Sequence, residues 1–552
     1  MGSTGRGSAH RPGCYDPGPV PRPDDAPTDP PVRGRDVWVA VLLLISLGAT
    51  APYFSRLMNA NERPRVLQAI AWVDAGELAV DGPAARGIRP GIDVARSPVD
   101  GRLYPNKPPG ATLPAVVGYG ALRLVAAVGG PEPTLRSTTI AARLLGGLLP
   151  TMVLLLWLVR RLRQRGAGPA GDAAVLLVVL ATPLSSYARL LFGHSLAACL
   201  VLIGSMLVHD GVRSEQGDAR KALLGGVLAA SAIVVEYAAA FAGLPLAVLV
   251  IARWRSGTPW RVVLAAVVGA CLPVMALAAY HAAVFGSPWA TGYHHVVDAG
   301  FAQTHAKGLL GLGVPTTTSL FEHLLSPWGG LLVWAPLVAA GLGVALWRWT
   351  SLDSEERLAT VLLAMFTVIV IGLQQTGGWR VGPRYLVLAM PLAAYGLVHL
   401  LKQTQGKVAL VVVVLGVAIA STVLNTLAAN LFPHLIPHGN PLADVLLPLA
   451  AEGRSPSSLL PSGWLTLGPM LLLPVALVIA ALHQTFAPSS DDAPVRPPLV
   501  IALGSAIAAA LIALGCTMTS HPEADGDLAA IHRIWEPDGT RPPRDVTLTA
   551  LP

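Results

Sequence analysis

The run VALVVVVLGVAIASTVLNTL, residues 408–427, decides the fold class, because its 20 residues include no charged side chain. As an α-helix it would extend about 30 Å, the thickness of the hydrocarbon core of a bilayer. The whole chain has a matching composition. Of its 552 residues, 53% are hydrophobic and 13% are charged, whereas a soluble chain carries about 25% charged residues. We therefore expect an all-α integral membrane protein.

Twelve other apolar runs share this character, and together they predict about 13 transmembrane helices. They lie at 37–54, 138–159, 172–189, 193–208, 222–236, 238–252, 262–284, 330–346, 358–375, 385–401, 465–483 and 498–516. The net charge of +7 comes from short basic groups between these runs, which is typical of orientation signals rather than of a nucleic-acid surface.

The stretch 222–252 is apolar except for Glu236-Tyr237. A single helix of this length would extend about 46 Å, well beyond the hydrocarbon core. Both flanks are basic, and two short passes return both flanks to the same side of the membrane. The sequence thus predicts a tight hairpin with Glu236 at its outer tip, where the carboxylate either lines a cavity or lies in water.

The segment 110–127 is apolar enough to span, but it contains Pro114 and Arg123. Placed flat at the outer interface, it turns residues 56–137 into one long external loop carrying juxtamembrane helices. The short inner loops then carry 15 basic residues and the outer ones five, as the positive-inside rule prefers. If 110–127 spans instead and the N-terminus lies outside, the later loops keep their sides, so charge alone leaves this rival topology open.

These boundaries predict three parts. Residues 1–36 form a disordered cytoplasmic tail rich in Pro and Gly, residues 37–516 the polytopic membrane domain, and residues 517–552 a polar external tail.

The first external loop opens with Asn59-Ala60-Asn61-Glu62-Arg63-Pro64-Arg65. A carboxylate here lies at the membrane surface, where it can take a proton from an acceptor hydroxyl or hold a divalent cation. The plain alternative is a charge cluster that marks the edge of the bilayer.

The same loop continues with Asp100-Gly101-Arg102-Leu103-Tyr104-Pro105-Asn106-Lys107-Pro108-Pro109-Gly110. Asp-Gly and Pro-Pro are turn signals. Lys107 presents an ammonium where an apolar segment begins, which suits a phosphate at the interface. The alternative is a snorkelling lysine that anchors the helix end.

Together these motifs resemble the GT-C superfamily, and within it the protein mannosyltransferase and aminoarabinose transferase group with its bacterial relatives. The resemblance covers roughly residues 37–400 as short islands. Besides Glu62 and the tyrosine–lysine–proline–proline segment, the islands are Tyr187–His194, Phe285–Pro288 with Gly292-Tyr293-His294, Ser326–Gly330 and Gly377–Tyr385.

The resemblance implies a glycosyltransferase of the bacterial plasma membrane. Such an enzyme takes a sugar from a polyprenyl-phosphate carrier and transfers it, with inversion, to an acceptor on the non-cytoplasmic face. It also implies the interfacial position of 110–127, with the N-terminus cytoplasmic and the C-terminus external. The acceptor is a protein, lipid or glycan. No cofactor is firmly implied, and a divalent cation stays open.

Carried over residue by residue, Glu62 matches the second acid of the family's opening pair and is the candidate catalytic base. Asn61 replaces the first acid, which puts in doubt a two-carboxylate or metal-bridged mechanism. Lys107 is the candidate for the carrier phosphate. His194 falls where several members carry an acid, and is either a second base or a histidine satisfied by its neighbours. Other candidate substrate contacts are Arg65, Tyr104, Glu236 and Tyr293.

Arg380 and Arg384 are two of the few cations expected on the external side, flanked by Trp379 and Tyr385. Arginine forks bind phosphate oxygens in pairs, and aromatic rings stack on sugars. The alternative is an aromatic belt with two rim cations.

Two functions from other classes stay open: a secondary transporter or lipid flippase, and a non-catalytic GT-C-like membrane protein. No internal repeat of the transporter kind is visible. The loop 285–328 contains His294, His295, His305 and His323, but their spacing matches no simple zinc motif. A nucleotide-binding loop and a serine nucleophile elbow are also missing from the sequence.

Overall fold

The computed structural model describes residues 34–48, 50, 52–54, 56–57, 59–305, 311–374, 378–454, 456, 464–486, 497–518, 521–535 and 545–548. The chain separates into two compact units, Met1–Val41 and Leu42–Pro552. Of the first unit, the description covers only the beginning of helix α1 (Gly34–Gly48). The fold and site below belong to the second unit. Most of the predicted tail 1–36 lies outside the described residues.

The second unit is almost entirely helical, and its long apolar helices confirm an all-α membrane protein. Within the described residues, eight helices are long and apolar enough to cross a bilayer. They are Pro109–Ala127, Leu135–Gln164, His194–Arg213, Tyr237–Arg255, Trp260–Phe285, Val408–Asn430, Leu467–Phe486 and Pro497–Cys516. Shorter apolar helices lie at Trp38–Gly48, Gly168–Leu180, Pro336–Trp347 and Leu442–Ala451.

The predicted external loop folds into a compact layer with its own core. Its elements are α2 (Arg63–Ala75), α3 (Asp81–Ala85), β1 (Val94–Arg96), β2 (Leu103–Pro105), η2 (Pro109–Thr112) and α4 (Leu113–Ala127). Val66, Ile70 and Tyr119 are buried in this core. Helix α4 packs against α2 and against α5 (Leu135–Arg143). Its interfacial position stays a prediction.

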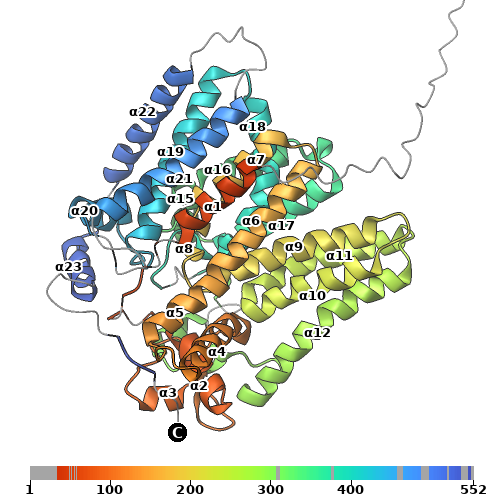
Figure 1. Cartoon of the computed structure of the whole chain (residues 1–552). Helices are drawn as coiled ribbons and strands as arrows, with labels where there is room; N and C mark the ends of the chain where they lie inside the picture. Colours follow the sequence, from red (N-terminus) through yellow and green to blue (C-terminus); the bar gives the residue numbers. More distant parts are fainter. Residues whose placement is uncertain are drawn as a thin grey trace, which may run out of the picture. The chain divides into compact units, whose positions relative to one another are not determined.

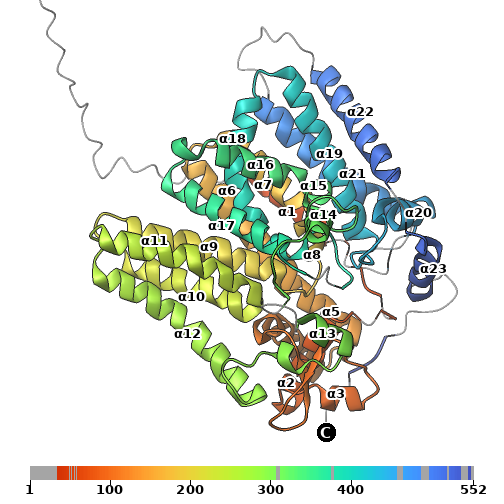
Figure 2. The same cartoon turned by 180° about the vertical axis from the view of Figure 1, so that it is seen from behind.

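The next helices follow the predicted runs, except that the run 172–189 is divided between two helices. They are η3 (Leu144–Leu148, a π-turn), α6 (Leu149–Gln164), α7 (Gly168–Leu180), α8 (Leu184–Tyr187), α9 (His194–Arg213), α10 (Ala219–Val235), η4 (Tyr237–Ala242), α11 (Gly243–Arg255) and α12 (Trp260–Phe285). Helix α10 packs between α9 and α12 in both views (Figure 1 and Figure 2). Arg253 and Thr258 donate to Val212 O at the end of α9, so the basic flanks of 222–252 meet and the chain reverses between α10 and α11 as predicted. The outer side for Glu236 stays a prediction.

The second half contains the remaining elements. They are η5 (Gly292–His295), α13 (Ala299–His305), α14 (Thr317–Leu324), α15 (Leu331–Trp334), α16 (Pro336–Trp347), η6 (Trp349–Ser351), α17 (Ser354–Ile371), η7 (Arg384–Leu388), η8 (Met390–Leu392), α18 (Ala393–Thr404), α19 (Val408–Asn430), η9 (Leu442–Leu446, a π-turn), α20 (Leu447–Ala451), α21 (Trp464–Phe486), α22 (Pro497–Cys516) and α23 (Ala524–Ile534). The predicted polar tail 517–552 thus includes a helix, α23.

Three predicted spans are wrong as continuous helices, and proline is the common reason. The run 172–189 ends as a regular helix at Leu180, before Thr182-Pro183. The run 330–346 breaks at Ala335-Pro336, and the run 385–401 begins with 3-10 turns around Pro391. A residue before proline is pushed out of the α conformation, and proline itself donates no hydrogen bond.

A charged cluster joins the ends of three helices. We call Arg161, Arg165, Asp210, Asp353 and Glu355 the arginine network. Arg161 of α6 donates to both carboxylate oxygens of Asp210 in α9 at 2.8 and 2.6 Å. It also donates to both oxygens of Glu355 in α17 at 2.9 and 2.6 Å. Every N–H nitrogen of this guanidinium therefore faces a carboxylate, which fixes α6, α9 and α17 to one another.

Candidate functional site

A cavity of about 350 Å³ lies between the first-loop layer and the second half of the chain. Its walls come from seven places in the sequence: residues 57 and 59–61, residues 91–93, Lys107, Phe192, Phe301, residues 378–379 with 384–385, and His434. The charged side chains that line it are Asp93, Lys107 and Arg384. Apolar and aromatic side chains, among them Phe192 and Trp379, cover the rest of the wall.

The β-hairpin of the first loop brings Asp93 and Lys107 together. Strand β1 pairs antiparallel with β2, and Ala95 lies opposite Tyr104. The turn between them contains Gly101 at φ 74°, a conformation that glycine adopts readily. Asn106 N donates to Asp93 O just beyond the ladder. Asp93 directly precedes β1, and Lys107 lies two residues after β2. Their side chains form an ion pair of 3.6 Å and are both buried.

Lys107 also lies over an aromatic ring. Its Nζ is 5.2 Å from the centre of the Tyr293 ring, and Tyr293 packs edge-on against Tyr237 at 5.4 Å. Lys107 is therefore held by a carboxylate and a π face, and it lines the cavity.

Arg384 reaches the cavity from the opposite wall. Its guanidinium lies 4.7 Å from the centre of the Tyr385 ring, and Nη2 donates to Tyr385 Oη at 2.7 Å. Its Nε has no hydrogen-bond partner among the described residues, although the side chain is buried. This guanidinium thus keeps part of its hydrogen-bonding capacity beside the cavity.

Arg65 of α2 lies behind the wall that Asn61 forms. Its Nη1 donates to Asn61 Oδ1 at 2.9 Å and to Leu191 O at 2.7 Å. Its Nε and Nη2 are buried and have no partner among the described residues. Glu236 interacts electrostatically with Lys107, Arg65 and Arg384. We call Arg65, Asp93, Lys107, Glu236 and Arg384 the cavity cluster.

Glu62 is fully engaged by its neighbours. Arg143 donates Nε to Oε1 at 2.8 Å and Nη2 to Oε2 at 2.6 Å. Leu191 N donates to Oε1 and Asn59 Nδ2 to Oε2, each at 2.7 Å. Burial alone would raise the pKa of Glu62, but the charge and hydrogen bonds of Arg143 lower it below its ordinary value. Glu62 lines a small adjoining cavity of about 20 Å³ and not the large one.

His194 lies at the start of α9, close to Glu236. Its Nδ1 is 3.4 Å from Glu236 Oε2, and its ring packs edge-on against Tyr187 and Tyr385 at 5.1 and 5.9 Å. Both side chains are buried. Glu236 is therefore buried in the protein and does not lie in water, but it is not among the residues that line the cavity.

Two other predicted site residues lie apart from the cavity lining. Tyr104 Oη donates to Asp100 Oδ2 at 2.7 Å, and its ring packs against Phe285. The guanidinium of Arg380 lies 4.6 Å from the Trp328 ring centre, and its backbone N donates to Leu435 O.

Sequence reasoning missed Asp93, Arg143 and His434. Asp93 and Lys107 lie seven residues before and seven residues after Asp100. A hairpin that turns at Asp100-Gly101 brings such positions close together, so the Asp-Gly turn could have indicated Asp93. Arg143 was a lone charge inside a predicted span, itself a functional signal. His434 lines both cavities, and burial lowers its pKa to about 3. Nothing in the local sequence announces that histidine.

The described residues contain two groups of three side chains with metal-ligand spacing: His438, His521 and Asp527, and His209, Asp210 and Glu355. Both lie outside the cavity lining. In the second group, Arg161 already occupies the carboxylates. Among the described residues, His294, His295 and His323 form no further group of this kind. The side chain of His305 lies outside the description.

Comparison with solved structures finds similarity to GT-C proteins. ArnT from Cupriavidus metallidurans in the apo state is 14% identical with a TM-score of 0.43, and 86% of this chain and 78% of that chain are covered. ArnT bound to undecaprenyl phosphate is 15% identical with a TM-score of 0.42, covering 86% and 76%. The archaeal oligosaccharyltransferase AglB from Archaeoglobus fulgidus, in complex with an inhibitory peptide and a dolichol-phosphate, is 10% identical with a TM-score of 0.37, covering 94% and 60%.

ArnT and AglB both belong to the GT-C superfamily that the sequence resembles. No protein-family model and no curated protein matches the chain. Identities of 10–15% with TM-scores below 0.5 do not allow a residue role or an activity to be transferred, so function has to be inferred from the site itself.

Proposed function

We propose that this protein is a membrane glycosyltransferase that moves a sugar from a polyprenyl-phosphate carrier to an acceptor at the membrane surface. One observation carries the proposal: Lys107 and Arg384 face the same cavity as a single lining carboxylate, Asp93. The lining side chains thus carry one positive charge in excess. A polyprenyl-phosphate sugar is a phosphodiester with one negative charge, which would neutralise it.

The shape and chemistry of the cavity suit such a donor. Its volume of about 350 Å³ is within the range of about 300–1,000 Å³ that is usual for small-molecule sites. Trp379 and Tyr385 offer faces on which a sugar ring can stack, and Phe192 and Ile92 offer apolar wall. The long apolar helices support a protein surrounded by lipid. The prenyl chain of the donor could then stay in the bilayer while its phosphate binds in the cavity.

In the proposed reaction, the acceptor O–H loses its proton to a carboxylate while its oxygen bonds to the anomeric carbon. The bond from that carbon to the phosphate oxygen breaks, and its electron pair leaves with the carrier phosphate. The carrier gains negative charge in this step, and Lys107 and Arg384 are positioned to stabilise it. Attack from the face opposite the leaving phosphate inverts the anomeric configuration.

Asp93 and Glu62 are the two candidates for the proton acceptor. Glu62 is the one that the resemblance implies, and its role stays a prediction. The geometry favours Asp93, because it lines the cavity whereas both oxygens of Glu62 already accept hydrogen bonds from Arg143 and from neighbouring groups. A donor phosphate that attracts Lys107 would free Asp93 to accept a hydrogen bond from the acceptor. Glu62 would then act by positioning Asn59 and Leu191.

The donor-transfer assay tests the proposal directly. Purified protein in lipid vesicles is incubated with labelled polyprenyl-phosphate sugars, and label that leaves the carrier is measured. We expect transfer by the wild type and a loss of about 10²–10³-fold in kcat/KM for Lys107→Met, the usual cost of removing one transition-state donor. Lys402→Met is the matched control, because Lys402 is exposed, lies outside the cavity lining and donates to Gly166 O.

Wild-type and Lys107→Met proteins with equal transfer rates would contradict the proposal. Movement of the carrier between leaflets, or solute uptake with an ion gradient, in the absence of transfer would instead favour the flippase or transporter.

Sidedness is tested separately. In a background without native cysteines, Val99→Cys on the hairpin turn and Arg160→Cys near the end of α6 are both at exposed positions. We expect a membrane-impermeant thiol reagent to label Val99→Cys only from outside and Arg160→Cys only from inside. The reverse pattern would remove the external site.

A further inference from the structure

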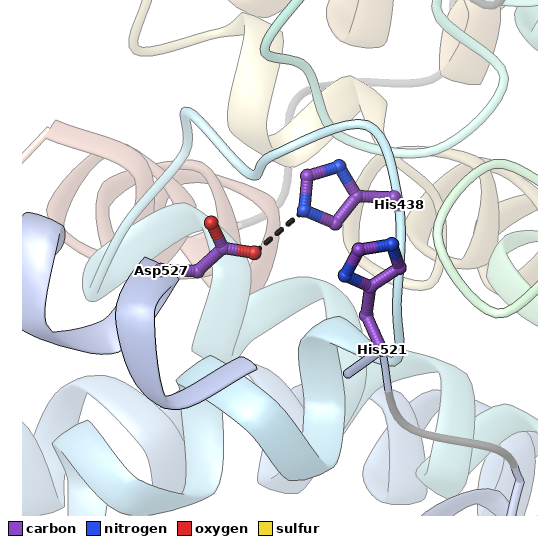
Figure 3. Close-up of side chains that lie close together, drawn as sticks. All are labelled: His438, His521 and Asp527. Atoms are coloured by element: carbon purple, nitrogen blue, oxygen red, sulfur yellow. Dashed lines mark hydrogen bonds and ion pairs between the residues drawn. The ribbon is translucent and has the colours of Figure 1, made fainter. Parts of the chain in front are cut away.

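Two histidines and an aspartate converge at a place that the proposed reaction does not use. His438 lies in the loop after α19, His521 lies after α22, and Asp527 lies in α23. In the close-up, both imidazole rings and the carboxylate face one another (Figure 3). One candidate ligand atom from each side chain lies within 4.8 Å of the others.

The short contacts in this group have the chemistry of a coordination site. His438 Nε2 and Asp527 Oδ2 are 2.6 Å apart, so a single proton is shared between a ring nitrogen and a carboxylate oxygen. The His438 and His521 rings are 4.2 Å apart, centre to centre. Two imidazoles at this distance repel each other when both are protonated, but a metal ion between their lone pairs attracts both.

We propose that His438, His521 and Asp527 form a binding site for a divalent transition-metal ion, with zinc as the metal that fits the ligand set best. Two imidazole nitrogens and one carboxylate oxygen are a common zinc set that leaves a fourth position for water. The ion replaces the proton between His438 and Asp527. Zinc ligands lie about 2.0–2.2 Å from the metal, so two ligand atoms of a tetrahedral ion are about 3.4 Å apart. His438 Nε2 and Asp527 Oδ2, which are 2.6 Å apart, therefore have to separate slightly to admit the ion.

The other group with metal spacing shows why this one is selected. His209, Asp210 and Glu355 also lie close together, but the Arg161 guanidinium donates to both carboxylates. A fixed positive charge there opposes a second cation. At the His438 group, Asp527 forms an ion pair with a ligand histidine, and among the described residues it pairs with no arginine or lysine. The site can therefore exchange a proton for a metal.

A metal here would tie the end of the chain to a wall of the cavity. His438 shares its loop with His434, which lines the cavity. Asp527 is on α23, and Trp535, directly after that helix, packs against Phe54 and Phe432 at 5.2 and 6.3 Å. The bound ion would close a connection of 89 residues between His438 and Asp527, and long closures of this kind restrict the unfolded chain most.

Metal binding is measured on the full-length protein, purified without a histidine tag, stripped with chelator and titrated with zinc chloride. We expect one zinc ion per chain by elemental mass spectrometry, and a zinc-dependent rise in Tm, because an ion that binds only the folded state stabilises it. Replacing zinc with cobalt should give the visible absorption bands of a low-symmetry nitrogen–oxygen site.

His521→Ala and Asp527→Asn should each lose the bound zinc and the rise in Tm, while their Tm without metal should stay near that of the wild type. His532→Ala is the matched control, since His532 is on the same helix and pairs with Glu452 rather than with the group. A wild type that binds no stoichiometric zinc would overturn the proposal. So would folded His521→Ala and Asp527→Asn variants that bind as the wild type does, because the zinc would then be adventitious.

Discussion

The cavity cluster and the arginine network are both groups of buried or half-buried charges, but they are completed to different degrees. In the arginine network, each N–H nitrogen of Arg161 donates to a carboxylate of Asp210 or Glu355. In the cavity cluster, Arg65 and Arg384 keep buried nitrogens with no partner among the described residues, and three cations face two carboxylates.

This difference indicates different purposes. Leaving a buried charged donor without a partner costs more than an ordinary hydrogen bond contributes. A charged group that only holds helices together gains nothing from unsatisfied donors. In the arginine network, the guanidinium nitrogens of Arg161 are all satisfied. We infer that the unsatisfied donors of the cavity cluster are completed by an anion when substrate binds.

The largest effect is expected from Asp93→Asn. It keeps the size of the side chain but removes the proposed proton acceptor, so transfer should fall about 10²–10⁴-fold. Asp218→Asn is the control, because Asp218 is a half-buried N-cap of α10 outside the cavity lining and asparagine caps equally well. Full activity in Asp93→Asn would return the role to Glu62.

Arg161→Met should act on stability instead of on catalysis. It leaves Asp210 and Glu355 without their shared cation, which should lower the free energy of unfolding by on the order of 3 kcal/mol. Transfer per folded molecule should stay unchanged. The measurement is denaturant unfolding in detergent beside the transfer assay, with the exposed neighbour Arg160→Met as control. If Arg161→Met unfolds like the wild type, the network does not hold α6, α9 and α17 together.

Arg384→Met should show the opposite pattern. Its loss removes a cation from the proposed leaving-group site, so kcat/KM should fall about 10²–10³-fold. Unfolding should be little affected, since the Arg384 side chain donates to Tyr385 Oη and forms no ion pair with a carboxylate among the described residues. A variant that loses stability and keeps its activity would mean that Arg384 belongs with the structural charges and would remove the contrast between the two regions.

The smallest effect concerns the Glu62–Arg143 pair at low pH. Burial alone would raise the pKa of Glu62, but in the folded state the charge and hydrogen bonds of Arg143 lower it below its ordinary value of 4.5. The pair therefore contributes its full stability above that pH, and the contribution is lost as the pH falls toward the folded pKa. Tm measured from about pH 6 to about pH 3 should decline more steeply in the wild type than in Glu62→Gln. Parallel curves would show that Glu62 titrates alike in both states.

The helical membrane fold was predictable because the composition of each long apolar run indicates that lipid, and not water, surrounds it. The hairpin 222–252 was predictable for the same reason, from its length and its basic flanks. The breaks within the predicted spans were not predictable, because the sequence of an apolar run has the same composition whether it forms one helix or is interrupted at Pro336 or Pro391. Proline was present in each, but its effect depends on what packs around the break.

The candidate site was predictable only in part. Lys107 and Arg384, which line the cavity, were among the predicted residues. Lys107 was predicted because it lies where an apolar segment begins, and Arg384 because cations are scarce on the expected external side. Asp93 and His434 were not, because their proximity to Lys107 comes from a strand register and from a loop far along the chain. The engagement of Glu62 by Arg143 was equally invisible, since a sequence shows a carboxylate but not the partner that holds it.

The packing of Trp535 on Phe54 has a consequence for how the protein is made. Nearby, Arg56 donates to Arg533 O across a separation of 477 residues. At a synthesis rate of about 5–20 residues per second, roughly 25–100 s pass between the appearance of these two positions on the ribosome. Phe54 lacks the Trp535 ring throughout that time, so this contact forms late in the synthesis of the chain.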